Sequence, residues 1–187
     1  MLTPSQRSLL LLFAVFAVPL ALAYGVYYLW PPSGHVNYGE LIPPRPVPDA
    51  ALRDLDGKEF SLARLRGKWL LVQWDSGACA EACRRKLYLM RQARLAQGKD
   101  MLRVERVWLL EDGRQPAPQV ISDNAGTWIV DAGASGLQQY FPAPGAPRDH
   151  VYLVDPLGNV MLRFPTDPDG QRMVKDLARL LRVSRAG

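Results

Sequence analysis

Residues 67–97 read GKWLLVQWDSGACAEACRRKLYLMRQARLAQ. The run 69–74 is almost entirely apolar, which is typical of a strand covered on both faces. After a Ser-Gly turn, residues 78–97 contain neither glycine nor proline. Apolar side chains recur there at Leu87, Met90 and Ala93, with Arg and Lys between them. This spacing predicts an amphipathic helix with a basic outer face.

The downstream sequence continues the alternation of strands and helices. It predicts a strand over 104–110, a short helix over 136–140, and a hairpin of strands 151–154 and 160–164 around a Pro-Leu-Gly-Asn turn. A closing helix begins after Asp167-Pro168, which offers a cap and a first-turn proline. Its buried stripe consists of Met173, Val174, Leu177, Leu180 and Leu181. Strands that alternate with helices predict an α/β sheet with flanking helices.

The amino-terminal segment has the composition of a membrane anchor. No Asp, Glu, Lys or Arg lies between Arg7 and Glu40, and residues 8–30 are long enough to cross about 30 Å of hydrocarbon as one transmembrane helix. Since positive charge favours the cytoplasmic side, we expect residues 1–7 in the cytoplasm and the remainder on the periplasmic, outer side of the inner membrane. The alternative is a cleavable signal peptide with its site at residues 21–23 (Ala-Leu-Ala).

Two further regions complete the predicted organisation. Residues 31–50 contain six prolines, which favour an extended, semi-rigid stalk. Residues 51–187 are sufficient for one domain with its own core. The chain is 48% hydrophobic and 22% charged, which excludes disorder along its whole length.

The two cysteines of the chain, Cys79 and Cys83, lie at the start of the predicted helix. Their number excludes a disulfide-dense scaffold and a four-cysteine zinc ribbon. The helix amino terminus and the neighbouring basic residues should make both thiols more acidic than free cysteine. Side chains four apart on a helix have Cβ atoms about 5–6 Å apart, whereas a disulfide needs about 4 Å. A disulfide therefore requires a distorted first turn, while a metal ion can bridge both thiolates if a third ligand is present.

His150 is the best candidate for a third ligand, because it opens the first strand of the predicted hairpin. Asp149 is placed to orient its second ring nitrogen. The alternative is a histidine at a strand edge that is satisfied by the backbone. His35 lies in the predicted stalk and is the poorer candidate, while Glu81 is expected to be a helix amino-terminal acid.

The soluble part resembles the thioredoxin-like superfamily, in particular its membrane-anchored Sco/SenC branch. The segments that carry this resemblance are LDGK (55–58), LRGKWLLV (65–72), CAEAC (79–83) and YLVDPLG (152–158). The resemblance implies a thioredoxin-like sheet outside one membrane span, and copper bound by Cys79, Cys83 and His150. It also implies help in building the copper centre of cytochrome c oxidase.

Three functions follow as hypotheses. The first is a tethered, Sco-like copper chaperone or thiol maintenance factor that contacts the bilayer through residues 8–30 and a cytochrome c oxidase subunit through its domain. The second is a thiol–disulfide oxidoreductase in which the more exposed Cys79 attacks and Cys83 resolves. The third is a degenerate redoxin-like domain with a structural role in a membrane assembly. A nucleic-acid partner is not expected outside the membrane.

Overall fold

A computed structural model describes residues 3–29 and 37–184, and the chain divides into two units at residues 36/37. The first unit contains α1 (Pro4–Leu29), the one helix in the described part of the chain that is long and apolar enough to cross a membrane. This agrees with the predicted anchor over residues 8–30, although Trp30 lies outside the described residues.

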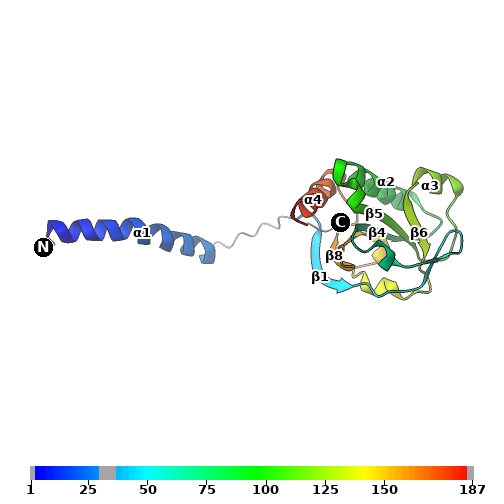
Figure 1. Cartoon of the computed structure of the whole chain (residues 1–187), viewed down its shortest axis with the longest axis horizontal. Coiled ribbons are helices and arrows are strands. Elements are labelled where there is room, and N and C mark those ends of the chain that lie inside the picture. The colour runs from blue at the N-terminus through cyan, green and yellow to red at the C-terminus, as the bar shows by residue number, and fades with distance from the viewer. Residues whose placement is uncertain (1–2, 30–36, 185–187) are drawn as a thin grey trace. The chain divides into compact units, whose positions relative to one another are not determined.

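The second unit is built around one eight-stranded sheet in the order β1-β8-β7-β4-β5-β6-β2-β3. Figure 1 labels β1, β8, β4, β5 and β6 of this sheet. The strands are β1 (Glu40–Pro46), β2 (Leu52–Asp54), β3 (Glu59–Phe60), β4 (Trp69–Asp75), β5 (Val104–Leu110), β6 (Thr127–Asp131), β7 (Val151–Val154) and β8 (Asn159–Arg163). The central strands β4, β5 and β6 are parallel, and the other pairs are antiparallel. The mixed sheet with flanking helices confirms the predicted α/β, thioredoxin-like fold class.

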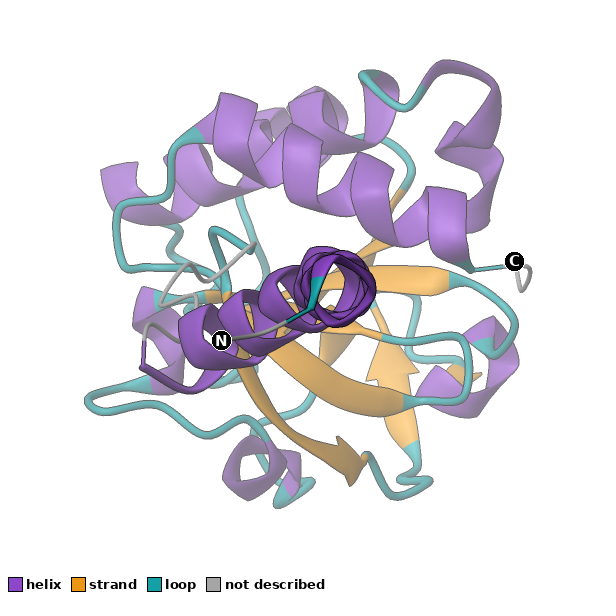
Figure 2. Cartoon of the chain, turned by 90° about the vertical axis from the view of Figure 1, so that its left-hand side faces the viewer, coloured by secondary structure: helices purple, strands orange, loops and turns teal. Residues whose placement is uncertain are grey.

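Helices cover both faces of this sheet. The α-helices are α2 (Glu81–Leu95), α3 (Pro118–Asp123) and α4 (Gly170–Val183), and the 3-10 turns are η1 (Leu62–Leu65), η2 (Gly98–Arg103), η3 (Leu137–Tyr140) and η4 (Pro147–Asp149). The long helices α2 and α4 pack against each other on one side of the sheet (Figures 1 and 2). The turns η1 and η3 contribute side chains to the core on the other face.

Strand β4 carries apolar side chains on both of its faces, so both faces of the sheet must be covered. Successive side chains of a strand point to opposite faces, so Leu70, Val72 and Trp74 pack in the core of η1 and η3. Trp69 and Leu71 pack with α2 and α4. The alternation places Gln73 on the α2 side, where it is a fully buried polar residue in an apolar strand.

The proline-rich segment is not a stalk over its whole predicted length. Residues 40–46 form β1, which pairs antiparallel with β8, so the compact unit begins at Asn37 rather than at residue 51. Prolines are compatible with this position because β1 is an edge strand with an irregularity between Leu41 and Arg45. Residues 31–36 of the predicted stalk lie outside the described part of the chain.

Several short elements and two helix boundaries also differ from the predictions. The elements that were not predicted are β2, β3, β6, α3 and the 3-10 turns η1, η2 and η4, because none of them is long enough to show a period of its own. Helix α4 is capped by Asp169, whose side chain accepts from the Arg172 N–H, rather than by Asp167. Helix α2 begins at Glu81 rather than at residue 78, and this shift changes the environment of the cysteines.

Candidate functional site: a buried cysteine pair at the start of a helix

Cys79 and Cys83 form a disulfide at the point where β4 leads into α2. Cys83 lies in the first turn of the helix, but Cys79 precedes the N-cap residue Ala80 and has a φ of 41°. It is the one non-glycine residue with positive φ in the described part of the chain. The left-handed conformation takes Cys79 off the helical path and leaves the two Cα atoms 5.1 Å apart. The expected distortion of the first turn is therefore confirmed.

The disulfide is covered by protein. Each cysteine residue is 1% exposed, so the expectation that Cys79 is the more exposed of the pair is wrong. Both pack in one apolar cluster with Leu87 of α2, Trp108 of β5 and Val120 of α3. A reagent that attacks either sulfur must therefore first displace part of this cover.

The segment 111–117, between β5 and α3, is held against the turn that precedes Cys79. The Asp112 carboxylate accepts hydrogen bonds from the Ser76 hydroxyl at 2.5 Å and from the Gly77 N–H at 3.0 Å. Gly77 also lies directly against the main-chain carbonyl of Arg114, with no space for a side chain. These contacts keep α3 over the cysteines.

Gln73 is the polar residue in contact with the disulfide. Its side-chain Nε2 donates to Cys83 Sγ at 3.4 Å, from the centre of the sheet. Its Oε1 is buried and has no hydrogen-bond partner among the residues that the structure describes.

A buried ion pair lies one turn further along α2. Lys86 was expected on the basic outer face of the helix, but it is buried, and its ammonium lies 2.8 Å from the Asp75 carboxylate at the end of β4. The same ammonium donates to the carbonyl of Arg148 in η4. Arg148 in turn forms an ion pair with Glu111 at 2.6 Å. This network joins the carboxyl ends of β4 and β5 to the segment that leads into β7.

Two carboxyls of this region have shifted pKa values. Burial raises the pKa of Glu111, and Arg148 offsets this only in part because Asp75 and Asp112 add negative charge. Burial acts in the same direction on Asp112, but hydrogen bonds from the Ser76 hydroxyl and from the N–H groups of Gly77 and Arg114 outweigh it and lower the pKa of Asp112.

His150 is held by the backbone and not by Asp149. Its Nδ1 lies 2.8 Å from the carbonyl oxygen of Phe164, and its ring packs edge-on against Tyr152, with centroids 6.1 Å apart. Tyr152 belongs to the core of the face opposite α2, whereas Val151 between them faces α2. Alternation along this extended segment places the imidazole on the face of the sheet away from the cysteines.

The predicted ligand set is therefore only partly assembled. The described residues contain no group of three His, Cys, Asp or Glu side chains placed to hold a metal ion. Cys79 and Cys83 are together, but as a disulfide, which has no thiolate to offer a metal. In this geometry the residues do not fit a three-ligand copper site.

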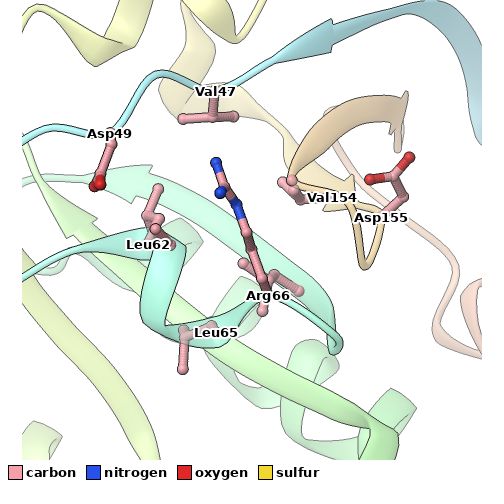
Figure 3. Close-up of a pocket in the computed structure, with 10 residues that line it drawn as sticks. Val47, Asp49, Leu62, Leu65, Arg66, Val154 and Asp155 are labelled. Carbon is pink, nitrogen blue, oxygen red and sulfur yellow. The ribbon is translucent and has the colours of Figure 1, made fainter. Parts of the chain in front are cut away.

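One hollow of the surface lies at the cysteine end of the sheet, and another of about 420 Å³ lies beside Phe60 and Arg64. A groove of about 440 Å³ runs beside Cys83, lined on its other sides by Asp75, Lys86 and Arg148. By contrast, the small pocket in Figure 3, into which the Arg66 side chain extends between Val47 and Val154, has about 20 Å³, enough for about one water molecule. It lies at the opposite end of β4, beside Leu70.

Sequence reasoning did not single out Gln73 or Asp75, and it placed Lys86 on the surface. One signal was available for Gln73, since a glutamine inside an otherwise apolar buried strand needs a partner. No local signal identifies Lys86, because the helical period alone does not show which charged residue meets a carboxylate from another element.

Comparison with known proteins agrees with this architecture. Residues 69–184 match the family described as transmembrane-like, thioredoxin-like, C-terminal domain. No curated protein matches the sequence at a significant level.

Solved structures share the fold at low sequence identity. Copper-bound ScoI from Bradyrhizobium japonicum superposes with a TM-score of 0.58 and 18% identity over 72% of this chain and 99% of that one. Copper-bound yeast Sco1 gives 0.62 and 15% over 76% and 96%. The thioredoxin domain of a thiol-disulfide oxidoreductase from Bacteroides vulgatus gives 0.55 and 20% over 76% and 99%. The resemblance to Sco/SenC proteins is thus confirmed as a likeness of fold. Since the matched family covers more than half of the chain, this protein belongs to the transmembrane-like, thioredoxin-like C-terminal domain family.

Proposed function

We propose that this protein is a membrane-tethered thiol–disulfide exchange factor that keeps cysteines of an exported client reduced. The observation that carries the proposal is the Cys79–Cys83 disulfide at the amino terminus of α2, in contact with Gln73 and beside a groove large enough for a peptide segment. In the reduced protein, the amino end of α2 stabilises a thiolate.

The reaction consists of two successive thiol–disulfide exchanges. The thiolate of reduced Cys83, which lines the groove, attacks a client disulfide, so that a mixed disulfide forms and one client thiolate leaves. Cys79 then attacks Cys83 Sγ, which reforms the internal disulfide and releases the second client thiol. The client is reduced by two electrons and the protein is oxidised by two. A dithiol reductant on the same side of the membrane must restore the pair.

The resemblance to Sco/SenC proteins supplies the proposed setting. The domain lies on the periplasmic side of the inner membrane with residues 1–7 in the cytoplasm, and the client is a cytochrome c oxidase subunit whose copper-binding cysteines must be reduced before they take up metal.

The test is to trap the mixed disulfide in the full-length protein. A C79S variant removes the resolving thiol, so it should accumulate a mixed disulfide with a model peptide disulfide, while the matched C83S variant should not. The wild-type pair should also equilibrate reversibly with dithiol buffers. A pair that stays oxidised below about −300 mV behaves as a structural disulfide and contradicts the proposal.

Copper binding is the second candidate, favoured by the shared fold with two Sco proteins whose structures contain copper. The donors proposed here are the Cys79 and Cys83 thiolates of the reduced pair, with His150 as the third ligand only if it changes face. When bound, the metal would itself be the cargo. Titration of reduced protein with Cu(I) should give one equivalent bound, lost in C79S. An unchanged stoichiometry in H150A would remove His150 from the set.

A further inference from the structure

The side chain of Gln73 is unusual because only one of its two buried polar atoms has a hydrogen-bond partner among the described residues. It is 0% exposed, and its Nε2 donates to Cys83 Sγ at 3.4 Å, while Oε1 has no partner among the described residues. Its neighbours on β4, Val72 and Trp74, are apolar and buried. Burial of a polar atom without a hydrogen bond costs free energy, and an apolar side chain here would avoid that cost.

The partner of Gln73 changes its chemistry with redox state. A disulfide sulfur is a weak acceptor. A thiolate accepts charge-assisted hydrogen bonds that are much stronger, so the Nε2 donor stabilises reduced Cys83 more than the disulfide. A protonated thiol gains in addition a weak S–H donor, for which the unpartnered Oε1 of the same amide is an acceptor. Reduction therefore improves the hydrogen bonding of Gln73 in either protonation state of Cys83.

The surroundings preserve this effect. Both cysteines are 1% exposed, so water competes little for the sulfur. Among the charged groups near this end of α2, Lys86 is bonded to Asp75 at 2.8 Å, and Arg85 forms an ion pair with Asp167 at 3.0 Å. The Arg84 guanidinium donates to the Cys79 carbonyl at 3.3 Å and not to a sulfur. An amide cannot take up a proton, so Gln73 acts through hydrogen bonding alone.

We propose that Gln73 is a positioning residue that shifts the Cys79/Cys83 couple toward the dithiol through its hydrogen bond to Cys83. This rests on the proposed function for its biological meaning, because it sets how strong a reductant the pair can be. In the reaction with dithiothreitol, the Cys79–Cys83 bond breaks, and the two sulfur atoms take up two electrons and two protons. Dithiothreitol loses two electrons and two protons as it forms its own internal disulfide.

The test is the equilibrium constant with dithiothreitol, measured on the full chain in detergent by tagging free thiols with a maleimide and counting them by mass. Q73M keeps the length of the side chain and removes both polar atoms. We expect its equilibrium to favour the disulfide by about tenfold relative to wild type, which is about 30 mV for a two-electron couple. The matched control is Q92M on the exposed side of α2, with no expected change.

The outcomes separate this inference from the proposed function. Equal constants for wild type and folded Q73M, or a shift of Q73M toward the dithiol, overturn the role of Gln73 whether or not a client is reduced. A reversible wild-type equilibrium with no exchange onto a client overturns only the proposed function. Q73L, with a similar volume and a different shape, repeats the measurement if Q73M does not fold.

Discussion

Gly77 provides the sharpest test of how the disulfide is covered. An ideal Cβ at this position would lie 1.8 Å from the carbonyl oxygen of Arg114 and 2.6 Å from its carbon. Ordinary contacts begin at 3.4 Å, so the carbonyl would have to withdraw by about 1.6 Å in G77A. Because these atoms are main chain, they cannot move aside by a change of rotamer. The segment 111–117 must shift as a unit.

The cost follows from overpacking. Forcing extra atoms into a filled space typically destabilises a protein by about 1–3 kcal/mol, while the loss of glycine's freedom in the unfolded chain returns about 0.4–1 kcal/mol. We therefore expect G77A to lower the free energy of unfolding by about 1–2 kcal/mol. The same shift loosens the cover over Cys79 and Cys83, so local opening and the rate of disulfide reduction should rise by about 5- to 30-fold.

The assay compares G77A with G145A in the full-length protein. The matched control carries the same change where an added Cβ would meet only the Asp149 carboxylate, at 3.7 Å. Urea unfolding followed by circular dichroism gives the free energies, and thiol tagging during reduction by dithiothreitol gives the rates. If G77A matches G145A in both measurements, segment 111–117 does not hold α3 over the disulfide.

Three further predictions address the charge network, the disulfide and the anchor. The pKa of Glu111 is raised in the fold, so its carboxyl contributes stability below the unfolded pKa that is lost as pH rises through the folded pKa. In urea unfolding, the free energy of unfolding of E111Q minus that of wild type should therefore increase as pH rises from about 4 to about 7. A difference that does not change with pH would contradict this. Breaking the five-residue Cys79–Cys83 loop by reduction should lower the free energy of unfolding by about 2 kcal/mol, and equal urea midpoints for oxidised and reduced protein would refute it. Deletion of residues 1–36 should move the protein from carbonate-washed membranes to the soluble fraction, and its retention there would count against α1 as the anchor.

Features that depend on local periodicity could be predicted from the sequence. The apolar run that became β4, the stripe of α4 and the uncharged segment that became α1 each show their pattern within a single element. The position of the cysteines at the start of α2 and the need for a distorted first turn belong to the same class. Both follow from helical spacing alone.

Features that depend on contacts with residues far away in the sequence could not be predicted from the local pattern. The proline content of residues 40–46 predicts an extended linker, but in the structure they pair with β8. Proline is compatible with both an extended linker and an edge strand, so composition does not distinguish them. The sequence of α2 does not distinguish Lys86 from the other basic residues of the helix. Only the folded structure brings its ammonium to Asp75 and to the Arg148 carbonyl. The face on which His150 lies depends on the register of β7 against β4.

The cysteine pair shows the division most clearly. Its spacing and its place after a buried strand predicted that the two sulfur atoms lie close together, since residues four apart at a helix start need no long-range contact to meet. Its burial under α3, its contact with Gln73 and its separation from His150 arise from packing between elements far apart in the sequence. Packing of that kind is settled by the whole core, because each side chain's neighbours are set by strand order and register and not by its own local pattern.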